Sequence, residues 1–145
     1  MPELTYQAAT LEDAPAIFRL CKDLIDTYEN KNLIDYDQVL AWVREKISAN
    51  ISSYTSVYEA GQKVAYYCLC RQDGQWELDD LYVLPQFQNR GIGSQILKKC
   101  VNEINAPIYL YVFSKNLGAI RLYERYGFSA VQKVSETRQI MRREG

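Results

Sequence analysis

The sequence of 145 residues contains no histidine. Histidine is the usual general base of Ser-His-Asp and Cys-His nucleophile arrangements, and it is the commonest protein ligand of transition metals. Its absence excludes those hydrolase arrangements and leads us to expect no metal. Proton transfer near neutral pH must then depend on carboxylates, tyrosines or water.

Long apolar runs are also missing. No stretch approaches the roughly 18 consecutive apolar residues that a transmembrane helix needs. The N-terminal Met1-Pro2-Glu3 lacks the basic-then-apolar pattern of a secretory signal. We therefore expect a cytoplasmic protein that does not insert into a membrane.

Cysteine is scarce, with four residues in the chain. Their spacing fits neither a dense disulfide scaffold nor the paired C-x-x-C pattern of a zinc site. We expect ordinary buried thiols at Cys21, Cys68, Cys70 and Cys100. Cys68 and Cys70 should point to one face of a strand, because side chains alternate along a strand.

The net charge is small, at −1. A nucleic-acid-binding domain would normally be much more basic, so we expect no nucleic-acid partner. Residues 1–50 carry five basic and nine acidic side chains, whereas residues 51–145 carry twelve and nine. The first part would favour a cation and the second an anion, and the alternative is a set of ordinary solvated faces.

With 48% hydrophobic residues, the chain is long enough for one core, and we expect a single domain over residues 1–145. Periodicity and turn residues predict its elements. In chain order these are a strand over 4–8, a helix ending near 28, a helix over 35–50, strands over 53–59, 64–71 and 76–83, a helix over 91–105, a strand over 108–113, a helix over 116–126, and strands over 128–133 and 137–141. The three central strands form an antiparallel meander, and the order indicates an α+β or α/β sheet with crossover helices.

A polar loop with two glycines joins the strand at 76–83 to the next helix. Gly91 and Gly93 let the backbone approach a ligand closely, and successive N–H groups at a helix start form an anion cradle. Arg90 adds a full positive charge. Alone, this pattern fits a plain strand-to-helix turn equally well. A Walker loop is excluded because no Lys-Ser or Lys-Thr follows, and a dinucleotide fingerprint would need a third glycine.

Two segments together resemble a known family. Residues 88–93, Gln-Asn-Arg-Gly-Ile-Gly, are similar to the Q/R-x-x-G-x-G/A signature of the GNAT superfamily of acyl-CoA N-acyltransferases. Residues 116–128 resemble that family's N-x-x-A-x-x-L-Y-x-x-x-G-F segment, at the separation that the fold requires. The resemblance implies an α+β fold, a mixed α/β sandwich in which helices cover both faces of a central, mostly antiparallel twisted sheet.

The resemblance also implies acetyl-CoA as co-substrate and assigns residues to it. The pyrophosphate of coenzyme A would lie on the loop formed by Gln88, Asn89, Arg90, Gly91, Ile92, Gly93 and Ser94. Backbone groups of Leu81 and Val83 would pair with the pantetheine arm like an added strand, and an N–H group near them would face the thioester oxygen. Asn116 matches a position that often contacts the cofactor.

Tyr123 matches the family's frequent general acid, which protonates the departing thiolate. A tyrosine of ordinary pKa, about 10, is protonated at neutral pH and can donate. The family match therefore implies catalysis or cofactor contact for Tyr123. The alternative is one more half-buried aromatic residue in a chain with 12 tyrosines.

An attacking amine must lose a proton, because an alkylammonium has a pKa of about 10.4. Glu77 lies 11 residues before Gln88, where the histone-acetylating branch of the family carries its glutamate base. Asp79 and Asp80 are rivals, since a bulge in this strand would change which side chains face the cleft. A water chain is a further candidate, and all three acids can instead cap an exposed strand end.

The resulting hypothesis is an N-acetyltransferase in which a primary amine attacks acetyl-CoA directly within a ternary complex. No covalent enzyme intermediate is needed. The alternative from another class is a non-catalytic acyl-CoA-binding module with a regulatory or partner-binding role. A more distant alternative is a phosphate-binding structural domain.

The acceptor is a small-molecule or peptide amine in this hypothesis. Five acidic residues crowd the region where such folds close over the acceptor, and they would attract cationic amines such as polyamines, aminoglycosides or a lysine-bearing peptide. These residues are Asp23, Asp26, Glu29, Asp35 and Asp37. The alternative is helix capping and ordinary surface charge. Similar proteins commonly dimerise, and the terminal strands are the candidate edges for a homodimer.

Overall fold

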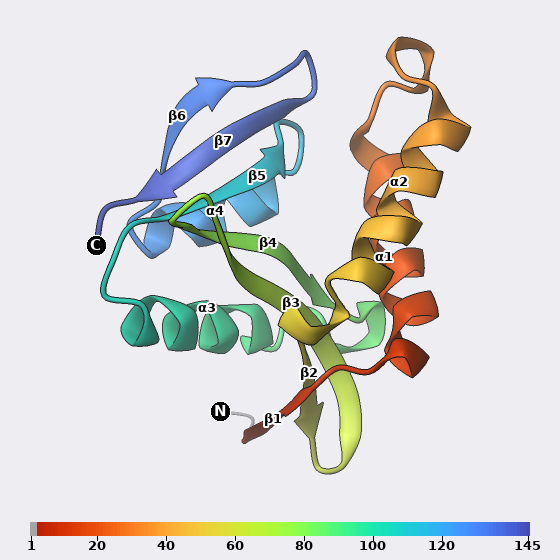
Figure 1. Cartoon of the computed structure of the whole chain (residues 1–145). Coiled ribbons are helices and arrows are strands. Elements are labelled where there is room, and N and C mark those ends of the chain that lie inside the picture. The colour runs from red at the N-terminus through yellow and green to blue at the C-terminus, as the bar shows by residue number, and fades with distance from the viewer. Residues whose placement is uncertain (1–2) are drawn as a thin grey trace.

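A computed structural model describes residues 3–145 (Figure 1). Met1 and Pro2, which belong to the N-terminal segment expected to lack a secretory signal, lie outside the described residues. Four α-helices and seven strands follow one another. They are β1 (Leu4–Ala8), α1 (Ala14–Tyr28), α2 (Tyr36–Ala49), β2 (Tyr54–Glu59), β3 (Gln62–Gln72), β4 (Gln75–Val83), α3 (Ile92–Glu103), β5 (Ile108–Phe113), α4 (Leu117–Arg125), β6 (Ser129–Lys133) and β7 (Arg138–Arg143). The expected order of elements is confirmed.

All seven strands belong to one sheet, in the order β1-β2-β3-β4-β5-β7-β6. β2, β3 and β4 form the antiparallel meander that the turn residues predict, and β1 pairs antiparallel with β2. β5 lies parallel to β4, and α3 provides the crossover between them. Since β5–β7 and β6–β7 are antiparallel again, the sheet is mostly antiparallel, as expected.

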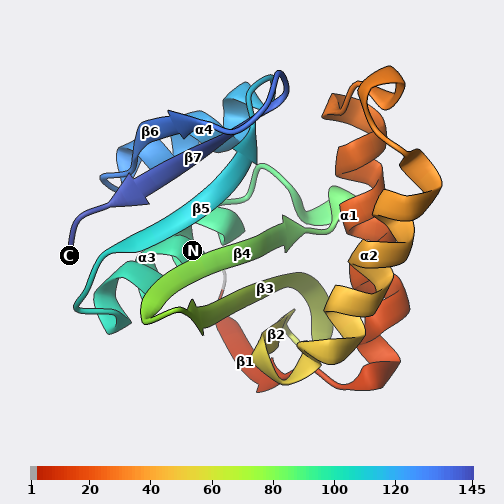
Figure 2. The same ribbon diagram turned by 45° about the horizontal axis from the view of Figure 1, so that its top comes forward.

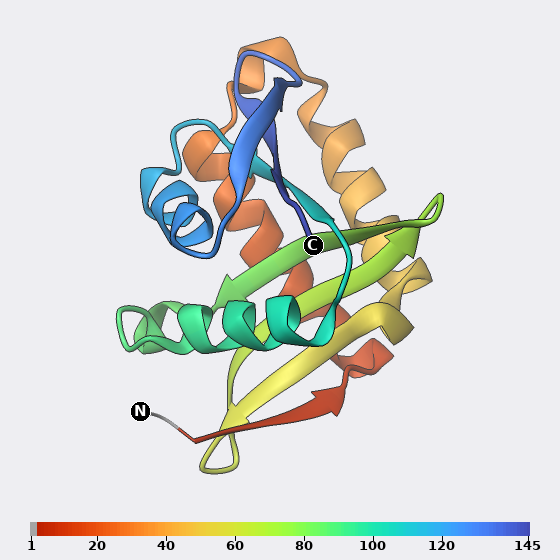
Figure 3. The same cartoon turned by 90° about the vertical axis from the view of Figure 1, so that its left-hand side faces the viewer.

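Helices cover both faces of the sheet, with α3 on one face and the α1–α2 pair on the other (Figure 3). α3 and α4 bury Ile96, Leu97 and Tyr123 against strand residues such as Leu110. α1 and α2 pack Ile17, Ile47 and neighbours against a second strand face that includes Tyr54, Tyr66 and Tyr82. Burying each large aliphatic side chain stabilises the fold by roughly 1.5–3 kcal/mol, so both helical layers hold the sheet in place. The α+β fold with helices on both faces is confirmed.

Several element ends differ from the sequence-based expectation. A short 3-10 turn over Leu11–Asp13 precedes α1, and the Asp13 carboxylate accepts the Thr10 N–H at 2.9 Å. Phe128 lies outside β6 because its N–H closes the end of α4 on the Tyr123 carbonyl, at 3.1 Å. The last strand begins at Arg138, because Thr137 belongs to the turn before it. The Asp35 cap of α2 is confirmed by its bond from the Gln38 N–H, at 3.2 Å.

β4 contains a bulge at Asp79. Cys68 of β3 pairs with Asp80, whereas the next residue, Leu69, pairs with Leu78, so Asp79 has no partner on β3. Trp76 and Leu78 pack in the α3/α4 layer before the bulge, and Leu81 and Val83 do so after it. The side-chain alternation of β4 therefore shifts by one residue at Asp79.

The four cysteines are free thiols, and Cys68 and Cys70 share one face of β3, as expected. Cys68 and Cys100 are buried, whereas Cys21 and Cys70 are half-buried, contrary to the expectation of four buried thiols. Within residues 3–145, no helix is both long enough and apolar enough to cross a membrane.

Candidate active site

The parallel strands β4 and β5 form backbone pairs only at their N-terminal ends. They pair at Trp76 with Ile108 and at Glu77 with Tyr109, and no further pairing follows. Beyond these rungs the two strands diverge, as Figure 2 shows. One edge of β4 is therefore left without a strand partner along its C-terminal half.

Backbone groups of Leu81 and Val83 point to this open edge. The Leu84 N–H donates to the Val64 carbonyl of β3 at 2.9 Å. Because backbone direction alternates along an antiparallel strand, residues 82 and 84 face β3 and residues 81 and 83 face away from it. The structure thus places the two residues expected along the pantetheine arm at the opening between β4 and β5.

The loop after β4 delivers free amides to the same end of the strand. Asn89 and Gly91 adopt left-handed backbone angles, with φ of 64° and 81°. The first bond of α3 runs from the Gln95 N–H to the Gly91 carbonyl, at 3.1 Å. The N–H groups of Ile92, Gly93 and Ser94 consequently have no acceptor within the helix, and they carry the positive end of its dipole. This geometry fits a diphosphate anion.

Gly93 sits where three elements meet. A Cβ atom at this position would lie 3.5 Å from Leu122 Cδ2 of α4 and 3.8 Å from Val83 Cγ2 of β4. Both distances are ordinary van der Waals contacts, so a methyl group at this position fits against both elements. The small residue therefore keeps the amide end of α3 close to β4.

Two side chains of the loop have partners that the sequence did not suggest. The Arg90 guanidinium forms a forked ion pair with Glu59 at the end of β2, with N–O distances of 3.1 and 3.2 Å. Gln88 donates through Nε2 to the Val83 carbonyl at 3.1 Å. The charge of Arg90 is thus partly neutralised by Glu59, and one carbonyl of the open edge already accepts a hydrogen bond.

α4 contributes Asn116 and Tyr123. Asn116 caps this helix, because its Oδ1 accepts the Ala119 N–H at 3.3 Å. Tyr123 is buried in the same cluster as Leu81 and Val83, with its ring 5.8 Å from that of Phe128. Burial raises the pKa of Tyr123 well above its ordinary value, and the negative charge of Asp80 raises it further. Tyr123 is therefore fully protonated at neutral pH, and the same shift makes it a weaker acid than an exposed tyrosine.

Two acids of β4, Glu77 and Asp80, are buried, at 8% and 7% exposure. Burial, and then the charge of Asp79, raises the pKa of Glu77 to about 7. The Tyr109 hydroxyl opposes this shift by donating to Glu77 Oε1 at 3.2 Å. Glu77 can therefore exchange a proton close to neutral pH.

The other two acids are held by stronger partners. The hydroxyls of Tyr54 and Tyr82 both donate to Asp80, the latter at 2.7 Å. Lys46 of α2 lies 2.8 Å from Asp79 and 3.7 Å from Asp80. Glu77, in contrast, has no ion pair with any residue described by the structure. The bulge thus separates one acid that titrates near neutral pH from two that are fixed in place.

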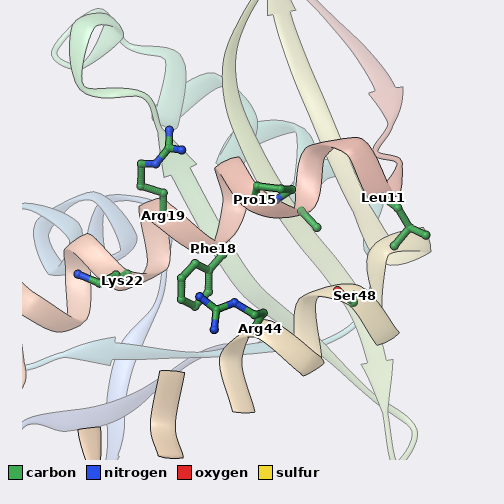
Figure 4. Close-up of a pocket in the computed structure, with 8 residues that line it drawn as sticks. Leu11, Pro15, Phe18, Arg19, Lys22, Arg44 and Ser48 are labelled. Carbon is green, nitrogen blue, oxygen red and sulfur yellow. The ribbon is translucent and has the colours of Figure 1, made fainter. Parts of the chain in front are cut away.

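Two hollows are lined by residues of α1 and its neighbours. The larger hollow, of about 560 Å³, lies between α1 and α2, and its lining includes Arg19, Lys22 and Arg44 (Figure 4). Arg44 stacks over the Phe18 ring at 4.1 Å, whereas Arg19 points away from both (Figure 4). This hollow is lined by α1, α2 and the turn before α1, and by no residue of β4 or β5.

The smaller hollow, of about 350 Å³, lies between the α1–α2 connection and the β6–β7 hairpin. Its lining includes Tyr28 and Glu29 from the end of α1 and Thr137 from the hairpin. Tyr28 stacks on Phe113, the last residue of β5, with ring centroids 6.0 Å apart. The hollow therefore borders the end of β5 that has diverged from β4.

Three of the five acids expected to attract a cation have structural partners. Asp26 binds Lys22, Lys31 and Tyr36. Asp35 caps α2, and Glu29 accepts from the Thr137 hydroxyl and the Asn30 N–H. In the part of the chain that the structure describes, no group of three or more acids and thiols is arranged to hold a metal ion.

Comparison with known proteins agrees with this geometry. The family model described as Acetyltransferase (GNAT) family matches residues 17–128. A spermine/spermidine N(1)-acetyltransferase of Bacillus subtilis is 34% identical over 62 residues, which cover 39% of this chain and only 41% of that relative.

Solved structures share the fold at low identity. The PaiA N-acetyltransferase from Thermoplasma acidophilum, solved in complex with coenzyme A, matches with a TM-score of 0.75 and 15% identity, covering 99% of both chains. The ribosomal-protein-S18-alanine N-acetyltransferase from Escherichia coli matches with a TM-score of 0.70 and 19% identity, covering 98% of this chain and 94% of that one. At such identities these matches establish the fold.

Proposed function

The chain belongs to the GNAT family of acetyltransferases, and from this we propose that it binds acetyl-CoA and transfers the acetyl group to a primary amine by direct attack. The family resemblance seen in the sequence is confirmed. One observation carries the proposal. β4 and β5 diverge after Glu77, and the open edge of β4 leads to the free amides at the start of α3. A donor and an acceptor can meet in that opening.

The donor side has the groups that a phosphorylated thioester requires. The amides of Ile92, Gly93 and Ser94 are available for the diphosphate. The backbone of Leu81 and the N–H of Val83 are available for the amide-containing arm, as a strand edge is for an added strand, and the Val83 carbonyl already accepts from Gln88. Acetyl-CoA supplies the activated acetyl group in this scheme, and the protein supplies its orientation.

The residues around the opening divide the proton transfers between them. Glu77, with a pKa of about 7, accepts the ammonium proton directly or through water, which leaves a neutral amine. Tyr123 keeps its proton at neutral pH and gives it to the leaving thiolate. A backbone N–H near Leu81 to Val83 stabilises the oxyanion, a contribution of about 2.7–4 kcal/mol. Orientation of two reactants contributes about 7–11 kcal/mol more.

The acceptor enters through the smaller hollow in our proposal, because this hollow borders the diverged end of β5. Glu29 and Glu136 line it together with Lys115, so its net charge favours a cation weakly. The partial similarity to a spermine/spermidine N(1)-acetyltransferase makes polyamines the first acceptors to test. The neutralisation of Asp26 by two lysines argues against a strongly anionic entrance.

The test is CoA release from acetyl-CoA with a panel of acceptors. The panel contains polyamines, aminoglycosides, peptides with a lysine side chain and peptides with a free N-terminal amine. Neutral and acidic amines of similar size are included for comparison. Transfer to at least one amine, with a product heavier by one acetyl group, supports the proposal. Tight acetyl-CoA binding without transfer to any amine, the protein's own lysines included, would establish the non-catalytic alternative instead.

A further inference from the structure

Lys46 of α2 reaches the sheet at the bulge of β4. Its Nζ lies 2.8 Å from Asp79 Oδ2 and 3.7 Å from Asp80 Oδ2, so one ammonium bridges the extra residue of the bulge and the residue after it. Within residues 3–145, no other basic side chain forms an ion pair with either acid. The contact links a helix of the acceptor side directly to the strand that carries Glu77.

The register of β4 decides where its acids point. Trp76 and Leu78 pack toward α3 and α4, so Glu77 between them faces the α1/α2 side. After the bulge, Leu81 and Val83 pack toward α3 and α4, so Asp80 also faces the α1/α2 side. A bulge displaced by one residue would turn one of these acids to the opposite face. An anchor on Asp79 and Asp80 therefore fixes the face on which the acids lie.

Lys46 is the cation of an otherwise acidic and neutral cluster. The titratable groups that face it or Glu77 are Cys21 from α1, Tyr54 from β2, Cys68 and Cys70 from β3, Glu77, Asp79, Asp80 and Tyr82 from β4, and Tyr109 from β5. Burial opposes the charge of Lys46, but Asp80 and Asp79 outweigh it and raise the pKa of this lysine. Lys46 therefore remains an ammonium at any pH at which the protein works.

The same charge acts on Glu77. After burial, Asp79 is the largest cause of the raised pKa of Glu77, and Lys46 lowers that pKa. Lys46 also neutralises Asp79 through a close ion pair. Loss of the ammonium would leave Asp79 as an uncompensated negative charge beside Glu77 and make Glu77 harder to deprotonate.

We propose that Lys46 is a positioning residue for Glu77: it acts through Asp79 and Asp80 to hold the bulge of β4, and it keeps Glu77 available as a proton acceptor. The kinetic part of this inference rests on the proposed acetyl transfer. The electrostatic part does not, because it concerns the ionisation of Glu77 in the free protein.

The experiment compares Lys46→Met, Lys46→Arg and the matched control Lys22→Met. Lys22 is a fair control because its Nζ lies 2.8 Å from Asp26, and its side chain is 40% exposed against 37% for Lys46. The Glu77 side-chain carboxyl carbon is titrated by NMR without acetyl-CoA, and its signal is identified by its loss in Glu77→Gln. The pH dependence of kcat/KM is measured on the same proteins.

The proposal predicts that Lys46→Met raises the titration midpoint of Glu77 by about half a pH unit, the effect of one charge at a partly solvated distance. The acidic limb of kcat/KM moves upward with it. Lys46→Arg restores both, and Lys22→Met changes neither. Asp80 keeps its two tyrosine donors in Lys46→Met, which favours correct folding.

An unchanged Glu77 midpoint in folded Lys46→Met overturns the proposal. A raised midpoint with an unmoved kcat/KM limb shows that Glu77 is not the proton acceptor, and the positioning role falls with it. If the wild-type protein transfers no acetyl group, the proposed function fails while the NMR titration still decides the role of Lys46. If Lys46→Met does not fold, Lys46→Gln replaces it, and the Glu77 midpoint must rise in the same way.

Discussion

Tyr109 and Glu77 face each other on the last rung that joins β5 to β4, and the Tyr109 hydroxyl donates to Glu77 Oε1 at 3.2 Å. Beyond this rung the two strands separate. The carboxyl group that titrates near neutral pH therefore lies at the apex of the opening in which donor and acceptor are proposed to meet. Its position connects the sheet topology with the proton transfer.

Replacing Glu77 by glutamine tests this connection kinetically. Glutamine keeps the size of the side chain and can still accept from Tyr109, but it cannot take a proton. We expect kcat/KM at pH 7.5 to fall by about 10²–10⁴-fold, the usual contribution of general base catalysis. The acidic limb near pH 7 should disappear from the profile. A retained limb and a loss below fivefold would assign the proton to another group.

The same variant should change the pH dependence of stability. The pKa of Glu77 is raised from 4.5 to about 7 in the folded state, so the native protein binds more protons than the unfolded chain between these values. Stability contributed by this group is present at low pH and is lost as pH rises through about 7. Glutamine does not titrate, so the unfolding free energy of Glu77→Gln minus that of wild type should be about 2–3 kcal/mol larger at pH 8 than at pH 4. Urea denaturation at both pH values measures the difference, and a gain at pH 4 alone would contradict the assignment.

Tyr123→Phe removes the proposed acid without removing the ring. The ring remains buried against Phe128, and no hydrogen bond of the hydroxyl to another residue is described. We expect the unfolding free energy to change by less than about 0.5 kcal/mol and kcat to fall by about 10²-fold. Stopped-flow measurement of thiolate protonation locates the slow step. Wild-type kcat and pH profile in this variant would remove Tyr123 from the mechanism.

The two glycines of the loop should differ in their tolerance of alanine. Gly91 has a φ of 81°, in the left-handed region, so Gly91→Ala should cost about 1–2 kcal/mol of stability. Gly93 has helical geometry within α3, and an added methyl group makes only ordinary contacts, so Gly93→Ala should cost less than about 1 kcal/mol. Thermal unfolding monitored by circular dichroism compares them. Equal losses would mean that the backbone of Gly91 relaxes.

The sequence predicted those features that depend on residues close together in the chain. The Gly91–Gly93 loop, the α4 segment around Tyr123 and the meander all follow from local spacing and turn residues. The bulge was anticipated only as an option somewhere in the strand over 76–83, because its place depends on which side chains the two helical layers bury. Pairing with β3 locates it at Asp79.

Sequence patterns did not predict the side-chain contacts between segments that are far apart in the chain. Lys46 meets Asp79 because α2 packs on the sheet face that β4 shares. Glu59 meets Arg90 although β3 separates β2 from β4 in the sheet. No local motif carries this information. The assignment of the site residues to acetyl-CoA, the cationic acceptor and the homodimer stay predictions.

The account depends most directly on the amides at the start of α3 holding the diphosphate of acetyl-CoA. Isothermal titration calorimetry of folded protein with acetyl-CoA measures this, and pantetheine, which lacks the diphosphate together with the phosphoadenosine and acetyl groups, is the comparison ligand. We predict one site per chain, competition by coenzyme A, and binding to pantetheine weaker by at least about 1.4 kcal/mol, a factor of ten. Absence of heat with acetyl-CoA, or equal affinity for pantetheine, would contradict the account.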